Sequence, residues 1–187
     1  MKSRLAILSA VLVLTGAIVS GADAPKAPAP AKKASPPSLP PTQADVPYGT
    51  HPKQVLHFWK AESATPTPLL FFIHGGGWQA GDRMSGLAGI LPNILKAGIS
   101  VVSVEYRFIA EATADKVEPP VKGPLHDAAR ALQFVRSKAA EWNIDKQRIG
   151  ASGGSAGACS SLWLAFHPDL ADPKSGDPVA RESTRLW

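Results

Sequence analysis

The apolar positions of this chain fall into short runs, several of which have the length and composition of β-strands. Residues 69–73 are continuously apolar, which is typical of a strand that is covered on both faces. Residues 100–106 are rich in valine, whose β-branched side chain fits a pleated surface. Residues 54–59 predict a third, shorter strand, and residues 148–152 a fourth.

Other apolar residues recur at three- and four-residue intervals, which predicts amphipathic helices. The longest such stretch covers residues 125–139. Residues 85–97 predict an irregular helix that Pro92 interrupts, and a further helix is expected over residues 155–166.

Strands and helices therefore alternate along the chain. This alternation predicts an α/β fold, with a mainly parallel sheet and helices on both of its faces. Right-handed crossovers place the strand-to-helix turns together at one edge of such a sheet. We therefore expect the residues after 69–73 and after 148–152 to lie close together.

The N-terminus has the layout of a secretory signal peptide. Lys2 and Arg4 precede an apolar run over residues 5–19, and small residues follow the run. We expect residues 1–22 to be the signal peptide, with cleavage after Ala22, and the protein to be secreted or periplasmic. An uncleaved membrane anchor is the alternative.

Residues 23–47 are rich in proline, alanine and lysine, and eight of the 18 prolines lie within residues 25–47. Such a composition buries little apolar surface, so we predict a disordered linker. A proline-rich ligand for a partner module is the alternative. The remaining residues, 48–187, are expected to form a partial α/β domain.

Charge gives no support for nucleic-acid binding. The net charge is +5, but from Asp45 onward the chain holds 15 basic and 14 acidic residues, so the excess lies in the N-terminal part. Cys159 is the single cysteine, which excludes an internal disulfide, and we expect it to be a buried helix residue.

Residues 153–157 read Gly-Gly-Ser-Ala-Gly, a Gly-x-Ser-x-Gly pattern between a predicted strand and a predicted helix. In that context Ser155 can be held on a sharp, strained turn with its hydroxyl above the sheet. Gly153 and Gly157 are needed because a larger side chain would collide with the neighbouring backbone.

A second motif, His74-Gly75-Gly76-Gly77-Trp78, directly follows the apolar strand at residues 69–73. Consecutive glycines leave backbone N–H groups accessible, which is what stabilisation of a developing oxyanion requires. The two motifs are each weak alone. Together, each after a predicted strand, they indicate acyl-transfer chemistry.

With these motifs the chain resembles the N-terminal half of an α/β-hydrolase of the esterase/lipase type, close to the hormone-sensitive-lipase-like and bacterial feruloyl-esterase-like enzymes. Residues 50–187 carry the resemblance, including Gly81-Asp82, Tyr106-Arg107 and residues 145–149. The resemblance implies an acyl-serine mechanism without a cofactor.

The resemblance also assigns roles to individual residues. Ser155 would be the catalytic nucleophile, and Gly76, Gly77 and Ala156 would supply the oxyanion hole. Supporting roles around them fall to His74, Gly75, Gly153 and Gly157. Trp78 and Asp82 are expected to support the loop or to line the pocket.

The activating residues of a serine hydrolase are missing from the expected order. In this fold the serine is followed by an acid and then by a histidine, yet His167 precedes every acidic residue that follows Ser155. His74 and His126 are weak substitutes because both precede the serine. We therefore expect the chain to be an N-terminal fragment with weak or no activity.

Two other functions remain open from the sequence: a non-catalytic ligand-binding relative, and a peptidase or amidase of the same fold. Among hydrolases we expect a carboxylic-ester hydrolase acting on a small-molecule or polysaccharide-linked ester. No metal-ligand spacing is visible among the histidines. We expect no nucleic-acid partner and no stable membrane association once the signal peptide is removed, and the sequence leaves the oligomeric state open.

Overall fold

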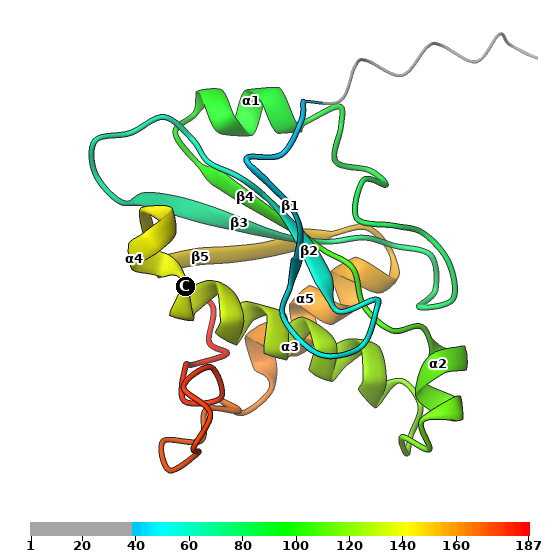
Figure 1. Cartoon of the computed structure of the whole chain (residues 1–187). Coiled ribbons are helices and arrows are strands. Elements are labelled where there is room, and N and C mark those ends of the chain that lie inside the picture. The colour runs from blue at the N-terminus through cyan, green and yellow to red at the C-terminus, as the bar shows by residue number, and fades with distance from the viewer. Residues whose placement is uncertain (1–38) are drawn as a thin grey trace, which may run out of the picture. The chain divides into compact units, whose positions relative to one another are not determined.

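The computed structural model describes residues 39–187, which form one five-stranded sheet with helices packed against it (Figure 1). The strands are Gln43–Pro47 (β1), Val55–Trp59 (β2), Thr67–Ile73 (β3), Ser100–Val104 (β4) and Ile144–Gly153 (β5). The helices are Leu91–Lys96 (α1), Ile109–Ala114 (α2), Lys122–Ser137 (α3), Ala139–Trp142 (α4) and Ala156–Phe166 (α5). The predicted signal peptide and residues 23–38 of the predicted linker lie outside the described residues.

The sheet order is β1-β2-β4-β3-β5, and the three strands that end near the predicted motifs are parallel to one another. Ile73 at the end of β3 is in register with Val104 of β4 and with Gly153 of β5. β1 and β2 are antiparallel to their neighbours, so the sheet is mixed rather than mainly parallel. The predicted α/β fold is confirmed.

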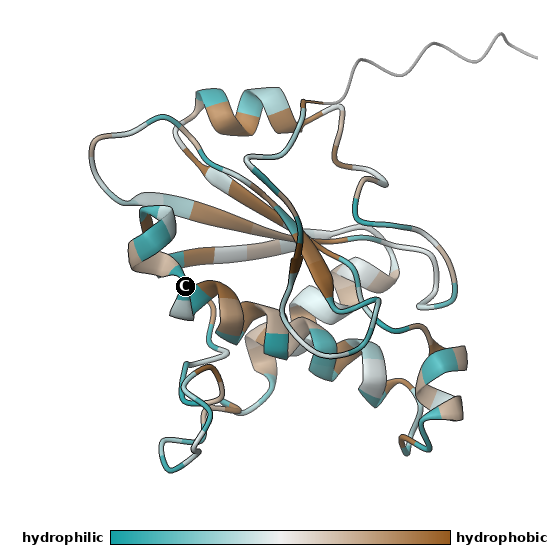
Figure 2. Ribbon diagram, in the orientation of Figure 1, coloured by the Kyte–Doolittle hydropathy of each residue, from teal (hydrophilic) through white to brown (hydrophobic). Residues whose placement is uncertain are grey.

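Helices cover both faces of the sheet, as predicted (Figure 1). On one face, α3 and α5 pack on a core that includes Phe58, Phe71 and Trp142. On the other face, Leu91 of α1 packs with Trp59 and other apolar residues in a smaller core. Much of β3 and β4 is brown in Figure 2, as expected of strands whose residues are buried between helices on both faces.

The boundary of the predicted linker is wrong, because residues 43–47 form strand β1. The strand is held by pairing with β2, and the indole Nε1 of Trp59 donates a hydrogen bond to Leu39 O at 3.0 Å. Pro47 is compatible with this strand because β1 lies at the edge of the sheet, where a missing N–H is tolerated.

Two local predictions also change. The helix expected over residues 85–97 is regular only from Leu91, since Gly86 has a positive φ of 84° and Pro92 occupies the first turn of α1. The prediction that Cys159 is buried is wrong, because its side chain lies on the exposed side of α5.

Residues 168–187 are irregular and are attached to α3 and β5. Gln133 on α3 donates hydrogen bonds to the carbonyl groups of Ala180 and Glu182, at 3.2 and 2.8 Å. The N–H of Trp187 donates to Ile149 O of β5 at 3.0 Å. The last residues therefore run beside the outer edge of β5.

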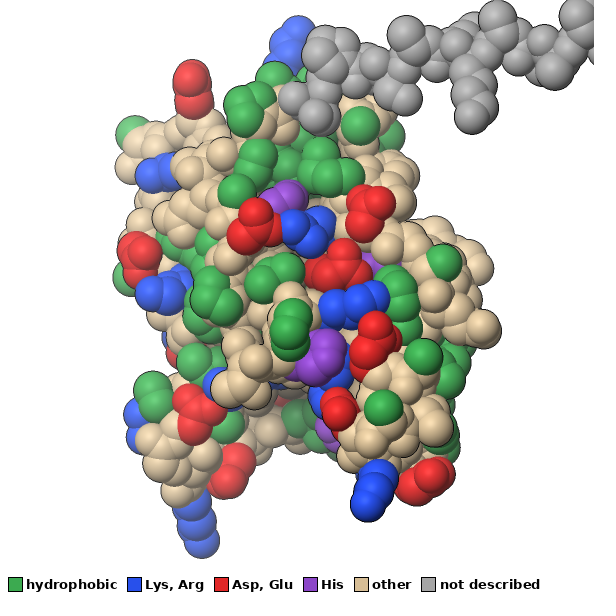
Figure 3. Space-filling model, turned by 45° about the vertical axis from the view of Figure 1, so that its right-hand side comes forward, with side chains coloured by type: hydrophobic (Ala, Val, Ile, Leu, Met, Phe, Trp, Pro, Cys, Tyr) green, Lys and Arg blue, Asp and Glu red, His purple; other side chains and the backbone are tan. Residues whose placement is uncertain are grey.

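Charged side chains of both signs are interspersed on the face seen in Figure 3. Ion pairs of the described residues include Arg107 with Asp115 at 3.0 Å and Lys53 with Glu111 at 3.3 Å. Within residues 39–187, no helix is long and apolar enough to cross a membrane.

Replacement of Phe58 by alanine tests the larger core. Phe58 is 1% exposed, and its ring stacks on Trp142 with 4.4 Å between the ring centroids. We expect Phe58→Ala to lower the free energy of unfolding by about 3–5 kcal/mol, measured by urea denaturation. The control is Phe166→Ala, since Phe166 is 83% exposed and its loss should change stability by about 0.5 kcal/mol or less. Equal effects of the two substitutions would contradict the packing described here.

Candidate active site

The two motif-bearing turns lie side by side at the carboxyl ends of β3 and β5. A Cβ atom placed on Gly75 would lie 3.6 Å from Cβ of Ser155 and 2.7 Å from the carbonyl oxygen of Gly154. The adjacency follows from the parallel pairing of β3 with β5, which ends both strands at the same level. The predicted juxtaposition of the motifs is confirmed.

Ser155 occupies a strained turn between β5 and α5. Its φ of 52° and ψ of −119° are unusual for a residue with a side chain, at a typical cost of about 1–3 kcal/mol. The serine is exposed and is the N-cap residue of α5. The turn therefore presents the hydroxyl at the positive end of the α5 dipole.

Gly153 and Gly157 flank this turn because there is no room for a Cβ atom at either position. A side chain on either residue would collide with the carbonyl oxygen of Ile73 at the end of β3. The glycines therefore allow the first turn of α5 to contact β3 directly.

The glycine loop after β3 presents its own backbone to the same space. Gly76 and Gly77 have positive φ values of 112° and 64°, and both are exposed. The carbonyl of Gly76 accepts hydrogen bonds from the N–H groups of Gln79 and Ala80, at 3.0 and 3.1 Å. Among residues 39–187, the N–H groups of Gly76, Gly77 and Ala156 have no hydrogen-bond acceptor.

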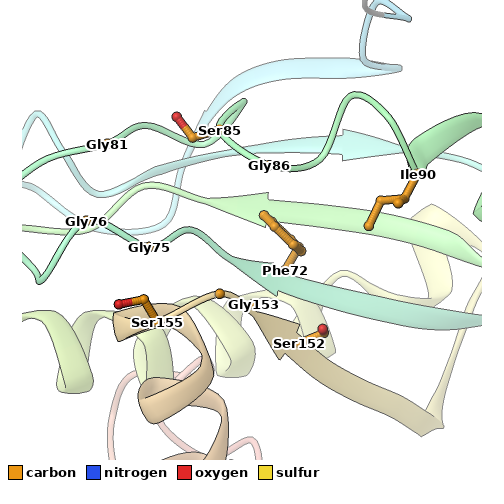
Figure 4. A pocket seen from close by; sticks show the side chains of 11 residues that line it. Phe72, Gly75, Gly76, Gly81, Ser85, Gly86, Ile90, Ser152, Gly153 and Ser155 are labelled. Carbon is orange, nitrogen blue, oxygen red and sulfur yellow. The ribbon is translucent and has the colours of Figure 1, made fainter.

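A pocket of about 640 Å³ opens beside Ser155 (Figure 4). Phe72 and Ile90 supply its apolar wall, and Ser85 and Ser152 are the other polar side chains beside the nucleophile turn. Its remaining lining consists of Gly75, Gly76, Gly81, Gly86, Gly153 and Gly154. The lining therefore contains no charged side chain.

His74 is completely buried beneath the glycine loop. Its Nδ1 lies 2.7 Å from Gly75 O, and its Nε2 lies 3.2 Å from Oε1 of Glu105. The ring also stacks on Tyr106, with 4.3 Å between the centroids. A ring that is enclosed in this way supports the loop and is not available to accept a proton from Ser155.

Trp78 links the glycine loop to α5, whereas the contact of Asp82 lies beyond the loop, within residues 82–84. The indole Nε1 of Trp78 donates to Oγ of Ser160 on α5 at 3.0 Å, which ties the loop to the helix. Asp82 is exposed and accepts a hydrogen bond from the N–H of Met84 at 2.7 Å.

No described residue is positioned as a base for Ser155. All five histidines of the chain lie within residues 39–187, and none of their hydrogen bonds involves Ser155. His126 and His167 both pack on Trp163 of α5, with ring centroids 5.7 and 4.2 Å away. Burial, followed by the charges of Lys122 and His167, lowers the pKa of His126. The catalytic roles assigned to the motif residues stay predictions.

Sequence reasoning missed two charged residues behind the glycine loop, Glu105 and Arg83. Glu105 follows β4 directly and is 6% exposed, and NH1 of Arg83 lies 3.7 Å from its Oε2. A glutamate inside the valine-rich stretch 100–106 was the available signal, since a buried carboxylate needs a partner.

The arrangement has solved counterparts. An acetyl ester-xyloside bifunctional hydrolase from Caldicellulosiruptor lactoaceticus matches with a TM-score of 0.63 and 27% identity over 79% of this chain and 55% of that chain. Apo esterase 2 of Thermogutta terrifontis matches with a TM-score of 0.62 and 27% identity over 81% and 55%. The fold is therefore that of an α/β-hydrolase of the esterase/lipase type.

Sequence comparison identifies the family within this fold. Residues 57–175 match the model of the BD-FAE family, which is more than half of the chain, and the chain belongs to that family. Gut esterase 1 of Caenorhabditis elegans is 34% identical over 128 residues, which are 64% of this chain and 22% of that protein. The chain thus spans about a fifth of this relative and about half of the two solved enzymes.

A metal centre finds no support in the described residues. Within residues 39–187, no group of three or more histidine, cysteine, aspartate or glutamate side chains is placed to hold a metal ion.

Two adjacent glycines provide a matched test of the nucleophile turn. We expect Gly153→Ala to lower the free energy of unfolding by about 1–3 kcal/mol, because the new methyl group would collide with Ile73 O. Gly154→Ala should change it by about 0.5 kcal/mol or less, since a Cβ there meets nothing within 4 Å. Urea denaturation of both variants measures the difference. Similar midpoints would argue against the close contact between the turn and β3.

Proposed function

We propose that the protein is a serine-dependent carboxylic-ester hydrolase that works through an acyl-serine intermediate. The observation that carries the proposal is the position of Ser155, on a strained turn beside the glycine loop and at the mouth of one uncharged pocket. Membership of the BD-FAE family, with esterases among the relatives, supports the same reaction class.

In the proposed reaction, Oγ of Ser155 attacks the carbonyl carbon of the ester while its proton passes to a base. Negative charge then develops on the carbonyl oxygen, where the N–H groups of Gly76, Gly77 and Ala156 would stabilise it. Collapse of the tetrahedral intermediate breaks the bond to the alcohol, which takes up a proton. Water then attacks the acyl-serine and releases the acid.

The base and the acid that orients it are proposed to lie outside residues 39–187. The described histidines all have other contacts, and the chain spans only part of its relatives. Nucleotide sequence that continues this reading frame, or a neighbouring one, would test the idea. A continuation without an aspartate or glutamate followed by a histidine would refute it.

The lining of the pocket favours an uncharged substrate moiety. Desolvation of a charged group in a pocket without counter-charges is unfavourable. A solved neighbour is described as an acetyl ester-xyloside hydrolase, which makes a short, neutral acyl ester the proposed substrate class. Such an ester can be a small molecule or part of a polysaccharide.

We also propose that the protein is exported, on the evidence of the N-terminal sequence pattern. Expression of the full chain in a Gram-negative host should release a mature protein that begins at Asp23. N-terminal sequencing of the purified protein checks this. A protein that retains Met1, or that begins far from residue 23, would contradict the proposal.

Acetylation by p-nitrophenyl acetate tests the role of Ser155 in the chain as it exists. The activated leaving group needs no protonation, so slow acylation is expected even without an adjacent base, and slow deacylation should let the acyl-protein accumulate. Peptide mass spectrometry should locate one acetyl group on Ser155. Ser155→Ala should abolish it.

The matched control is Ser85→Ala, because Ser85 lines the same pocket. This variant should be acetylated as the wild type is. Equal acetylation of the wild type and Ser155→Ala would instead favour a non-catalytic, ligand-binding relative of the family.

A further inference from the structure

A second cavity, of about 460 Å³, lies farther along β3 and β5 than the pocket beside Ser155. Its lining includes Leu70 of β3, Ile94 of α1 and Gly150 of β5, and Trp187 also contributes to it. These residues are apolar, so the second cavity, like the pocket at Ser155, has no polar side chain at the positions named here.

The two cavities lie on the same face of the sheet. Leu70 is in register with Gly150, and Phe72 of the first pocket is in register with Ser152. Residues two positions apart on a strand point to the same face and lie about 7 Å from each other. Both pairs are therefore on the face that α1 covers, where Leu70 and Phe72 pack with the smaller core. Figure 4 shows Phe72 and Ser152 on the same side of Ser155.

Helix α1 forms a wall that the two cavities share. Ile90, the N-cap residue of α1, lines the first pocket, and Ile94, one helical turn later, lines the second cavity. Successive turns of one helix and alternate residues of β5 thus line one continuous groove, which begins at Ser155. We call these two cavities together the apolar groove.

The apolar groove is open at Gly150 because this residue has no side chain. A Cβ atom placed there would meet no atom within 4 Å. Of the described residues that line either cavity, only Arg148 is charged. Its guanidinium donates to Oδ2 of Asp145 at 2.6 Å and to Pro66 O at 3.0 Å, so its aliphatic stem is the part left to line the groove.

We propose that the apolar groove binds the alcohol moiety of the ester, and that this moiety is an apolar chain. The inference rests on the ester-hydrolase function proposed above. With a short acyl group on Ser155, only the alcohol part is long enough to extend past Ser152 to Gly150. Each buried methylene group strengthens binding by about fourfold. A sugar in the same place would leave its hydroxyl groups without partners among the apolar lining residues.

The first arm of the experiment is an NMR titration of the full chain with hexan-1-ol. The amide signals of Ser152 and Ile94 should shift with saturation in the wild type. Gly150→Leu fills the groove and should weaken binding at least about tenfold. Absence of saturable shifts at these two amides would overturn the proposal.

The matched control is Gly176→Leu. A Cβ on Gly176 also meets no atom within 4 Å, and this residue lines neither cavity. The control should bind hexan-1-ol as the wild type does, and equal affinities of Gly150→Leu and Gly176→Leu would refute the groove. If Gly150→Leu does not fold, Trp187→Ala replaces it, since that side chain is 89% exposed and its loss should weaken binding severalfold without unfolding the protein.

The second arm compares two acetate esters whose leaving groups have similar acidity, those of 4-hexyl-2-nitrophenol and 4-methyl-2-nitrophenol. The second-order rate constant for acetylation of Ser155 should be at least about tenfold higher for the hexyl compound. Gly150→Leu should remove most of this difference, and Gly176→Leu should retain it. Equal rate constants for the two esters in the wild type would refute an alcohol site in the groove.

The third arm compares p-nitrophenyl hexanoate with p-nitrophenyl acetate, which differ in the acyl chain. The hexanoate should show no rate advantage that depends on Gly150. An advantage that Gly150→Leu removes would overturn the assignment, because the acyl chain would then occupy the groove. Failure of every ester to acylate wild-type Ser155 would refute the proposed function, and the titration would still decide whether the groove binds an alkyl chain.

Discussion

The close approach of α5 to the end of β3 is the constraint on which the rest of this structure depends. The carbonyl oxygen of Ile73 lies where a side chain on Gly153 or Gly157 would have to be. Because both residues are glycines, α5 can begin directly beside β3, and Ser155 then lies next to the glycine loop. A single methyl group at this contact would collide with Ile73 O and push the Ser155 turn away from β3, so the position of Ser155 depends on packing.

A polar cluster of His57, His74, Arg83 and Glu105 lies beneath the loop. The Nε–H of Arg83 donates to His57, and the guanidinium of Arg83 also pairs with Glu105. Glu105 in turn contacts Nε2 of His74. This polar cluster lies between the glycine loop and the end of β4 and contacts both.

Sequence patterns predicted most of this architecture for identifiable reasons. The apolar run at residues 69–73 and the valine-rich run at residues 100–104 became β3 and β4, since both are buried by helices on each face. The two motifs were informative because each directly follows a predicted strand, whereas either pattern alone would have been weak evidence. β1 was missed because Gln43–Pro47 has no apolar alternation of its own and is ordered by pairing with β2.

The contacts of Glu105 could not be predicted in the same way. Its partners His74 and Arg83 are 31 and 22 positions earlier in the chain, and only the sheet brings them together. A buried carboxylate is expected to have a partner, but the neighbouring sequence does not identify which residue it is. Likewise, the exposure of Cys159 depends on which side of α5 faces the sheet, and periodicity defines that side poorly in a helix rich in small residues.

The two edge strands of the sheet, β1 and β5, differ in how readily a further strand could pair with them. β1 has a register shift near Asp45, whose φ is 50°, and such irregularity discourages a further strand. β5 pairs with β3 on one side, and on its outer side the described residues hold no further strand; residues 150–153 there are small. The N–H of Trp187 bonds to Ile149 O of β5, and the turn that carries Ser155 follows the end of the same strand. Any strand added at this edge would therefore lie next to the turn that carries Ser155.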